Sequence, residues 1–415
     1  MTLLAQVALT LTVLAGPLLV LLVDVGPHLR ARTGRQPRGG HRVVVVGPDV
    51  RPVHDLTLVV PIYGDLRYLE NVAWLSTYGN RVLLVTTGVE TPAFYRDLYA
   101  LAGAHGFRVH VAAGVRTTTG AGRRGTAGTV RDAIVRDAHS VLTSQYVVCV
   151  DADTVIDRPV GDLVGALHAA GLDVGSVPLA VAPHNLLTRL QRVEYALAMR
   201  LRRVMPWLVC GGCHVARRTV HAELMRRHSL FFQGNDVELG LLAVARGYRV
   251  GHLDVPVVTA VPATPRAWWR QRLAWAGGEF RIMVVNLRLG ARHPYLYLYG
   301  AVVTFALLPL RWWSALHAGW GLLLVVVAYA ALTVLLTRDL RDPVAWVYPA
   351  YTLLYSFLLL GVGWLTYTLM AVRSGNAGVI RPREAWWLPD PPDAPVVRRL
   401  PGPGPARASD WWARR

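Results

Sequence analysis

The chain has 415 residues, enough for one large or two ordinary domains, and a formal net charge of +18. All 44 basic residues are arginines, so a compositional bias contributes to this charge as well as any functional one. No helix-turn-helix, zinc-finger or RNA-binding sheet signature is present. We therefore expect no nucleic-acid partner, and anionic lipid or nucleotide phosphates remain as partners for the basic surface.

The chain begins with a stretch that suits a membrane. Residues 3–23 carry no charge and are about long enough to cross a bilayer. A basic segment before this stretch is missing and the arginines follow it, so we interpret residues 1–24 as a retained transmembrane helix and not as a cleaved signal peptide. Residues 25–53 form a basic linker, and the positive-inside rule places the next segment in the cytoplasm.

An α/β region follows at residues 54–261. Apolar runs predict strands at 56–60, 81–85, 107–112 and 146–150, with helical patterns between them at 91–104 and 129–142. This alternation predicts a parallel sheet with right-handed crossovers. No G-x-G-x-x-G turn follows the first strand and no G-K-[ST] phosphate loop is present, which excludes the two commonest nucleotide-binding folds.

The character of the chain changes at Pro262. Residues 262–293 interleave tryptophan with arginine, a pattern typical of an amphipathic segment at a membrane interface. Residues 294–372 contain apolar segments at 295–310, 319–336 and 345–372, which predict two or three C-terminal transmembrane helices. The Arg- and Pro-rich tail, 373–415, is expected to have little fixed structure.

The most distinctive strand is the one at 146–150, because two carboxylates follow it directly, at Asp151 and Asp153. Open α/β sheets bind ligands at the carboxyl ends of their strands. Two neighbouring oxygen ligands suit Mg²⁺ or Mn²⁺, and such an ion suits a diphosphate. An ordinary strand that runs into a polar turn would produce the same short pattern, so the neighbouring motifs decide its meaning.

Four motifs in order resemble those of membrane-bound family 2 glycosyltransferases, the group of the hyaluronan, chitin-oligosaccharide and cellulose synthases. They are Val-Pro-Ile-Tyr-Gly-Asp at 60–65, Asp-Ala-Asp at 151–153, Gly-Asn-Asp at 234–236 and Gln-Arg-Leu-Ala-Trp at 271–275. The resemblance implies a GT-A (nucleotide-diphospho-sugar transferase) domain inserted between transmembrane helices.

The resemblance also implies roles on the donor side. Asp153 is expected to bind the metal, and Asp151 to contact the metal or the ribose of the nucleotide. The other expected nucleotide-sugar contacts are Pro61, Tyr63, Asp65, and Arg123 or Arg124 beside the diphosphate. The second strand ends in Thr86-Thr87, where the family usually has an aspartate for the base.

On the acceptor side, Asp236 matches the general base that removes the proton of the attacking hydroxyl. An N-cap of the following helix is the alternative role for Asp236. Cys213 falls in the acceptor-side loop, Gln271 and Trp275 match the acceptor motif, and Ala274 replaces its arginine. Arg272 or Arg270 is expected to stand in for that arginine.

The sequence therefore predicts an inverting, metal-dependent glycosyltransferase that uses a nucleotide sugar, UDP-linked by expectation. The expected product is a β-linked polysaccharide or oligosaccharide, made at a bacterial inner membrane by a multi-pass protein with a cytoplasmic catalytic domain. Two alternatives stay open: a single transfer to a polyprenyl-phosphate or other lipid acceptor, and a non-catalytic membrane protein on a degenerate transferase fold.

Overall fold

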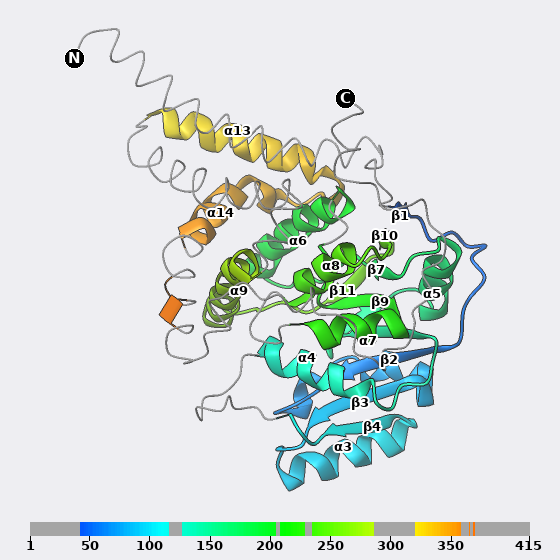
Figure 1. Ribbon diagram of the computed structural model, residues 1–415. Coiled ribbons are helices and arrows are strands. Elements are labelled where there is room, and N and C mark those ends of the chain that lie inside the picture. The colour runs from blue at the N-terminus through cyan, green and yellow to red at the C-terminus, as the bar shows by residue number, and fades with distance from the viewer. Residues whose placement is uncertain are drawn as a thin grey trace. The chain divides into compact units, whose positions relative to one another are not determined.

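The computed structural model describes residues 42–115, 127–204, 208–228, 235–285 and 320–357, together with 365, 368 and 369. Contacts divide the chain into two units. The described residues of the sheet unit are 42–115, 127–180, 208–228 and 235–260, and those of the helical unit are 181–204, 261–285, 320–357, 365, 368 and 369. Residues 181–204, within the region predicted as the catalytic domain, thus group with the helical unit. We describe each unit by itself (Figure 1).

The sheet unit contains an eight-stranded sheet in the order β1-β10-β7-β9-β5-β2-β3-β4. Its strands are β1 (Arg42–Val44), β2 (Leu56–Pro61), β3 (Val82–Thr87), β4 (Arg108–Ala112), β5 (Tyr146–Val150), β7 (Val174–Ser176), β9 (Cys213–Arg217) and β10 (Val250–Leu253). A second sheet has the order β6-β11-β8, from β6 (Thr154–Ile156), β11 (Val257–Thr259) and β8 (Leu179–Val181). β8 lies on the boundary between the two units.

The four predicted strands are present as β2, β3, β4 and β5, and they pair in parallel with one another. The predicted parallel pairing is thus confirmed for these four strands, whereas the sheet as a whole is mixed, because β9 runs antiparallel to both β5 and β7. Residues 210–214 were expected to form a loop, yet β9 begins at Cys213. His214 interrupts the apolar pattern of this strand, and for that reason the pattern did not predict it.

Helices cover both faces of the large sheet. They are α2 (Val72–Leu75), α3 (Pro92–His105), α4 (Ala127–Ala138), α5 (Val160–Ala169), α7 (Arg218–Arg227) and α8 (Asn235–Ala245), with 3₁₀ turns at Leu66–Tyr68 and Ser76–Arg81. One apolar core joins the sheet to α3 and α5. α4, α7 and α8 contact one another, and α4 and α7 pack on the strands (Figure 1).

Helix α3 shows how local signals set these boundaries. Pro92 occupies its first turn, where its missing N–H costs no hydrogen bond. The Thr91 side chain accepts from the Phe94 amide at 3.2 Å, which caps the helix. Gly106 ends it with a φ of 69°, a left-handed conformation that favours glycine. The helix therefore lies within one residue of the predicted range 91–104 at each end.

The helical unit contains α6 (Leu186–Val204), α9 (Pro265–Val285), α13 (Trp320–Leu336) and α14 (Tyr348–Phe357), with 3₁₀ turns at Arg338–Leu340 and Pro343–Trp346. A small core gathers Val193 of α6, Trp268 of α9 and Tyr351 of α14. The indole Nε1 of Trp268 donates to the Tyr351 hydroxyl at 2.8 Å. Trp268, expected at a membrane interface, is thus an internal packing residue of this unit.

None of the helices within the described ranges is both long enough and apolar enough to cross a membrane. α13 falls in the predicted segment 319–336, and α14 occupies part of 345–372. The predicted segments at 3–23 and 295–310 and the tail at 373–415 lie outside the described residues. Membrane insertion therefore stays a prediction.

Candidate active site

Asp151 and Asp153 stand at the carboxyl end of β5, the strand between β2 and β9. The turn that carries them is held by hydrogen bonds. The Asp151 amide donates to the Gly212 carbonyl at 2.9 Å, and the Asn71 side chain donates to the Asp151 carbonyl at 3.1 Å. Asp153 Oδ1 accepts from Thr154 Oγ1 at 3.2 Å. Both carboxylates are therefore positioned by the backbone around them.

Arg131 of α4, which the sequence analysis did not single out, is the cation of this site. Its Nε lies 3.0 Å from Asp151 Oδ1, and its Nη2 donates to the Gly211 carbonyl. Asp132 and Asp236 also act electrostatically on this guanidinium. As the fifth residue of α4, Arg131 carries no local signal of such a role, so only the contact reveals it.

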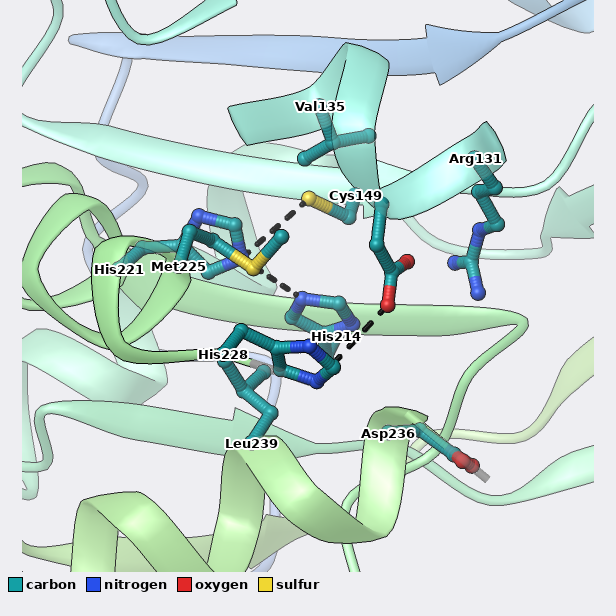
Figure 2. A pocket seen from close by; sticks show the side chains of 10 residues that line it. Arg131, Val135, Cys149, His214, His221, Met225, His228, Asp236 and Leu239 are labelled. Atoms are coloured by element: carbon teal, nitrogen blue, oxygen red, sulfur yellow. Dashed lines mark hydrogen bonds and ion pairs between the residues drawn. The ribbon is translucent and has the colours of Figure 1, made fainter. Parts of the chain in front are cut away.

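A double glycine separates Asp236 from Asp151. A methyl group at Gly211 would lie 3.2 Å from Asp236 Oδ2 and 3.4 Å from Arg131 Nη1. A methyl group at Gly212 would lie 3.7 Å from Asp151 Oδ2. The absence of side chains here lets both carboxylates approach the same backbone segment. Asp236 itself lies in the first turn of α8 (Figure 2).

The charges at this edge are unbalanced. The pKa of Asp151 is raised to about 6, mainly by burial; the Arg131 guanidinium opposes this rise, and the neighbouring carboxyls of Asp153, Asp132 and Asp236 add to it. Burial also raises the pKa of Asp153. Within the described residues these carboxyls share the guanidinium of Arg131, and a divalent cation would restore the balance. The oxygen donors of Asp151 and Asp153 fit Mg²⁺ or Mn²⁺ in their chemistry.

The loop after β2 holds the predicted nucleotide contacts. Pro61 is the last residue of β2. Burial raises the pKa of Tyr63 to about 12, so its phenol is neutral, and Asp151 and Arg131 act on it. Asp65 pairs with Arg67, with Nη2 and Oδ2 2.6 Å apart. Arg123 and Arg124 lie outside the described residues.

Glu90, also missed from the sequence, brings a carboxylate to the end of β3. Its Oε1 accepts from Thr87 Oγ1, and its Oε2 accepts from the Gly64 amide at 3.1 Å. It therefore bridges β3 and the loop after β2. Thr86 and Thr87 stand where the family usually has an aspartate. The carboxylate of Glu90, three residues after Thr87, lies at this strand end instead.

The predicted acceptor residues fall in two places. Cys213 is fully buried at 0% exposure, with its side chain in the apolar core. Gln271, Arg272 and Trp275 lie on α9 of the helical unit and contact one another. The Arg272 guanidinium lies 4.2 Å from the Trp275 ring centroid, and its Nη1 donates to Gln271 Oε1 at 2.8 Å. Its Nη2 lies 2.6 Å from Glu194 Oε2, a partner that the sequence did not indicate.

The mixed sheet and the Asp-x-Asp pair at the end of its central strand define a GT-A-like α/β fold of the nucleotide-sugar transferase type. A profile of the family described as glycosyl transferase family group 2 matches residues 146–365, more than half of the chain. The chain belongs to this family of glycosyltransferases.

Similar proteins carry related names. An N-acetylglucosaminyltransferase of Bradyrhizobium diazoefficiens is 31% identical over 164 residues, which cover 35% of this chain and 34% of that protein. One of Sinorhizobium fredii is 29% identical over 167 residues, covering 35% and 40% respectively. The matches thus span well under half of the length of these relatives.

Among solved structures, a mannosyltransferase from Pyrobaculum calidifontis in complex with GDP-Man and Mn²⁺ is 17% identical, with a TM-score of 0.49, and covers 82% of this chain and 99% of its own. Glucosyl-3-phosphoglycerate synthase from Mycobacterium tuberculosis is 14% identical, with a TM-score of 0.35, and covers 64% of this chain and 82% of its own.

Proposed function

We propose that the chain transfers a sugar, with inversion, from a nucleotide diphosphate sugar to a saccharide acceptor. The proposed site lies where the carboxyl end of β5 meets the first turn of α8. One observation carries the proposal. Asp151 and Asp236 come from positions far apart in the chain and approach the same double glycine, with Arg131 in contact with both Asp151 and Gly211. A sugar transferase needs such a meeting of a diphosphate site and a carboxylate base.

The residues divide the work by chemistry. A divalent cation bound by Asp153 and Asp151 would neutralise the charge that develops on the departing diphosphate. Asp236 accepts the proton of the acceptor hydroxyl as that oxygen attacks the anomeric carbon. Arg131 holds Asp151 in place through its ion pair. Asp236 as the carboxylate base is consistent with a single displacement, and the resemblance of the motifs to family 2 glycosyltransferases supports inversion to a β-linked product.

The donor is proposed to be a UDP-linked sugar, with UDP-N-acetylglucosamine as the first to test, because the similar curated proteins are named N-acetylglucosaminyltransferases. We place the nucleotide at the loop after β2. Tyr63 belongs to this loop, and Glu90 accepts a hydrogen bond from the Gly64 amide of the same loop. The acceptor is proposed to be a growing saccharide. The apolar stretches of the sequence support a place in a bacterial inner membrane, with the sheet unit in the cytoplasm.

The test is release of nucleotide by the full-length protein from UDP- and GDP-sugars, with Mn²⁺ or Mg²⁺ and with chelator. Asp236→Asn should abolish transfer and keep UDP binding, and Asp153→Asn should lose Mn²⁺-dependent UDP binding. Asp97→Asn is the matched control, since Asp97 is an exposed carboxylate on α3.

Several outcomes would change the proposal. Absence of metal-dependent turnover with every donor would instead favour a non-catalytic protein on a transferase fold. Retained turnover in Asp236→Asn would remove that residue as the base. A product that is a single sugar on a polyprenyl-phosphate, found by extraction into organic solvent, would replace the saccharide acceptor by a lipid.

A further inference from the structure

A second cluster of metal-binding side chains lies behind the candidate active site and takes no part in the chemistry above. It joins Cys149 of β5, His214 of β9 and His221 of α7, and all three side chains are buried. Cys149 and His214 are directly opposite each other in the antiparallel pair of β5 and β9, so they point to the same face of the sheet. α7 covers that face and brings His221 to them (Figure 2).

The spacing of the three ligand atoms fits a single tetrahedral ion. Cys149 Sγ lies 3.7 Å from His221 Nε2, and the Nε2 atoms of His214 and His221 are 3.1 Å apart. With Zn–S of about 2.3 Å and Zn–N of about 2.0 Å, tetrahedral geometry places sulfur and nitrogen about 3.6 Å apart and two nitrogens about 3.3 Å apart. The observed distances agree with both values within a few tenths of an ångström.

The outer nitrogens of both histidines are already occupied, which leaves the Nε2 atoms directed toward each other and the thiol. His214 Nδ1 lies 3.3 Å from the Cys210 carbonyl oxygen, and His221 Nδ1 lies 2.7 Å from His139 Nε2. Ligating histidines are typically held in this way by a carbonyl or another polar group on the nitrogen that does not bind the metal.

Space for an ion is present. The three side chains line a cavity of about 20 Å³, together with Met225, His228 and, on the side of the candidate active site, Arg131 and Asp236. This volume suffices for one metal ion or one water molecule and for little else. A thiolate with two imidazoles is a donor set that favours zinc and its chemical relatives over Mg²⁺ or Mn²⁺.

We infer that Cys149, His214 and His221 bind one zinc-class transition-metal ion. This ion is separate from the Asp151 and Asp153 site, and it crosslinks β5, β9 and α7. On binding, the proton of the Cys149 thiol leaves to solvent and a sulfur–metal bond forms. The ion takes up the lone pairs of the two Nε2 atoms. His221 then carries its hydrogen on Nδ1 and donates it to His139, so one proton is released per ion.

The test uses full-length protein purified with a tag that contains no histidine, dialysed against EDTA and analysed for metals by mass spectrometry. We expect about one equivalent of zinc that resists the dialysis, in the wild type and in Cys210→Ser. Cys210 is a buried cysteine outside the cluster, and its backbone carbonyl is kept in this variant. Cys149→Ser and His221→Gln should each lose the ion.

Spectroscopy keeps the inference testable if these variants fail to fold. Wild-type protein reloaded with Co²⁺ should show a sulfur-to-cobalt charge-transfer band in the near ultraviolet, and X-ray absorption of the zinc form should show one sulfur and nitrogen neighbours. Absence of both the bound zinc and the cobalt band would overturn the inference, as would zinc retained in Cys149→Ser. Either result would leave the three side chains as a hydrogen-bonded group in the core.

Discussion

Replacement of Arg131 by methionine tests whether one guanidinium balances the carboxylates at the end of β5. Removal of one partner from a buried ion pair costs about 3–5 kcal/mol. Asp151 keeps 35% of its side chain exposed and Arg131 keeps 20%, so solvent screens the pair. We discount the cost to about 2 kcal/mol. For a folding unit of about 150–250 residues, this corresponds to a melting temperature roughly 4–8 °C lower.

The assay is thermal unfolding of the full-length protein, followed by fluorescence, without and with MnCl₂. Without Arg131 the carboxylates attract a divalent cation more strongly, so Mn²⁺ should raise the melting temperature of Arg131→Met more than that of the wild type. A concentration of about 100 times Kd contributes roughly 2.7 kcal/mol. Arg131→Lys should fall between the two, because a single ammonium group cannot contact both Asp151 and the Gly211 carbonyl as the guanidinium does.

Arg96→Met is the matched control, because Arg96 forms an exposed pair with Asp97, with side chains 74% and 58% exposed. The control should change stability little. If Arg131→Met unfolds at the wild-type temperature and responds to Mn²⁺ as the wild type does, Arg131 is not the counter-charge of Asp151, and the account of the site given above is wrong.

Three further changes probe other parts of the chain. Gly211→Ala places a methyl group 3.2 Å from Asp236 Oδ2. It should lower kcat roughly tenfold and leave donor binding unchanged, because small displacements of a reacting group are costly. An unchanged kcat would contradict the proposed position of the base. Glu90→Gln removes the charged acceptor of the Gly64 amide, in the loop after β2. It should raise the KM for the donor about tenfold at constant kcat, as measured by initial rates. A change in melting temperature alone would make Glu90 a structural residue. The hydrogen bond from Arg189 lowers the pKa of Asp342, so this pair should stabilise the fold above pH of about 4 and lose that effect as pH falls through the lowered pKa. Unfolding of the wild type and Asp342→Asn should therefore differ at pH 7 and converge in acid, and a difference that persists in acid would refute the assignment.

Local patterns were sufficient for part of this architecture. The apolar runs predicted β2, β3 and β5, because a strand buried on both faces must be apolar at successive positions whatever its partners are. The abrupt change from Val150 to Asp151 predicted the end of the central strand. The helical pattern at 91–104 predicted α3, and Thr91, Pro92 and Gly106 set its limits, because capping is an interaction between residues close in sequence.

Contacts between distant residues lay beyond such patterns. Arg131 and Gly211 are 80 positions apart, and Cys149 and His221 are 72 apart. β9 was missed because His214, its second residue, interrupts the apolar pattern, and its partner strand β5 lies far away in the sequence. Glu90 supplies a carboxylate where the family has an aspartate, and its contact with the Gly64 amide, 26 residues earlier in the chain, is formed only in the folded structure.

The carboxylates Asp151, Asp153 and Asp236 were thus predicted one at a time, each from its own motif. Their shared setting was decided by the fold: Arg131 pairs with Asp151, and the double glycine lets Asp151 and Asp236 approach one backbone segment. The physical reason is that capping and burial act along a few neighbouring residues. The balance of charge in a site depends instead on which helices the sheet brings to its edge.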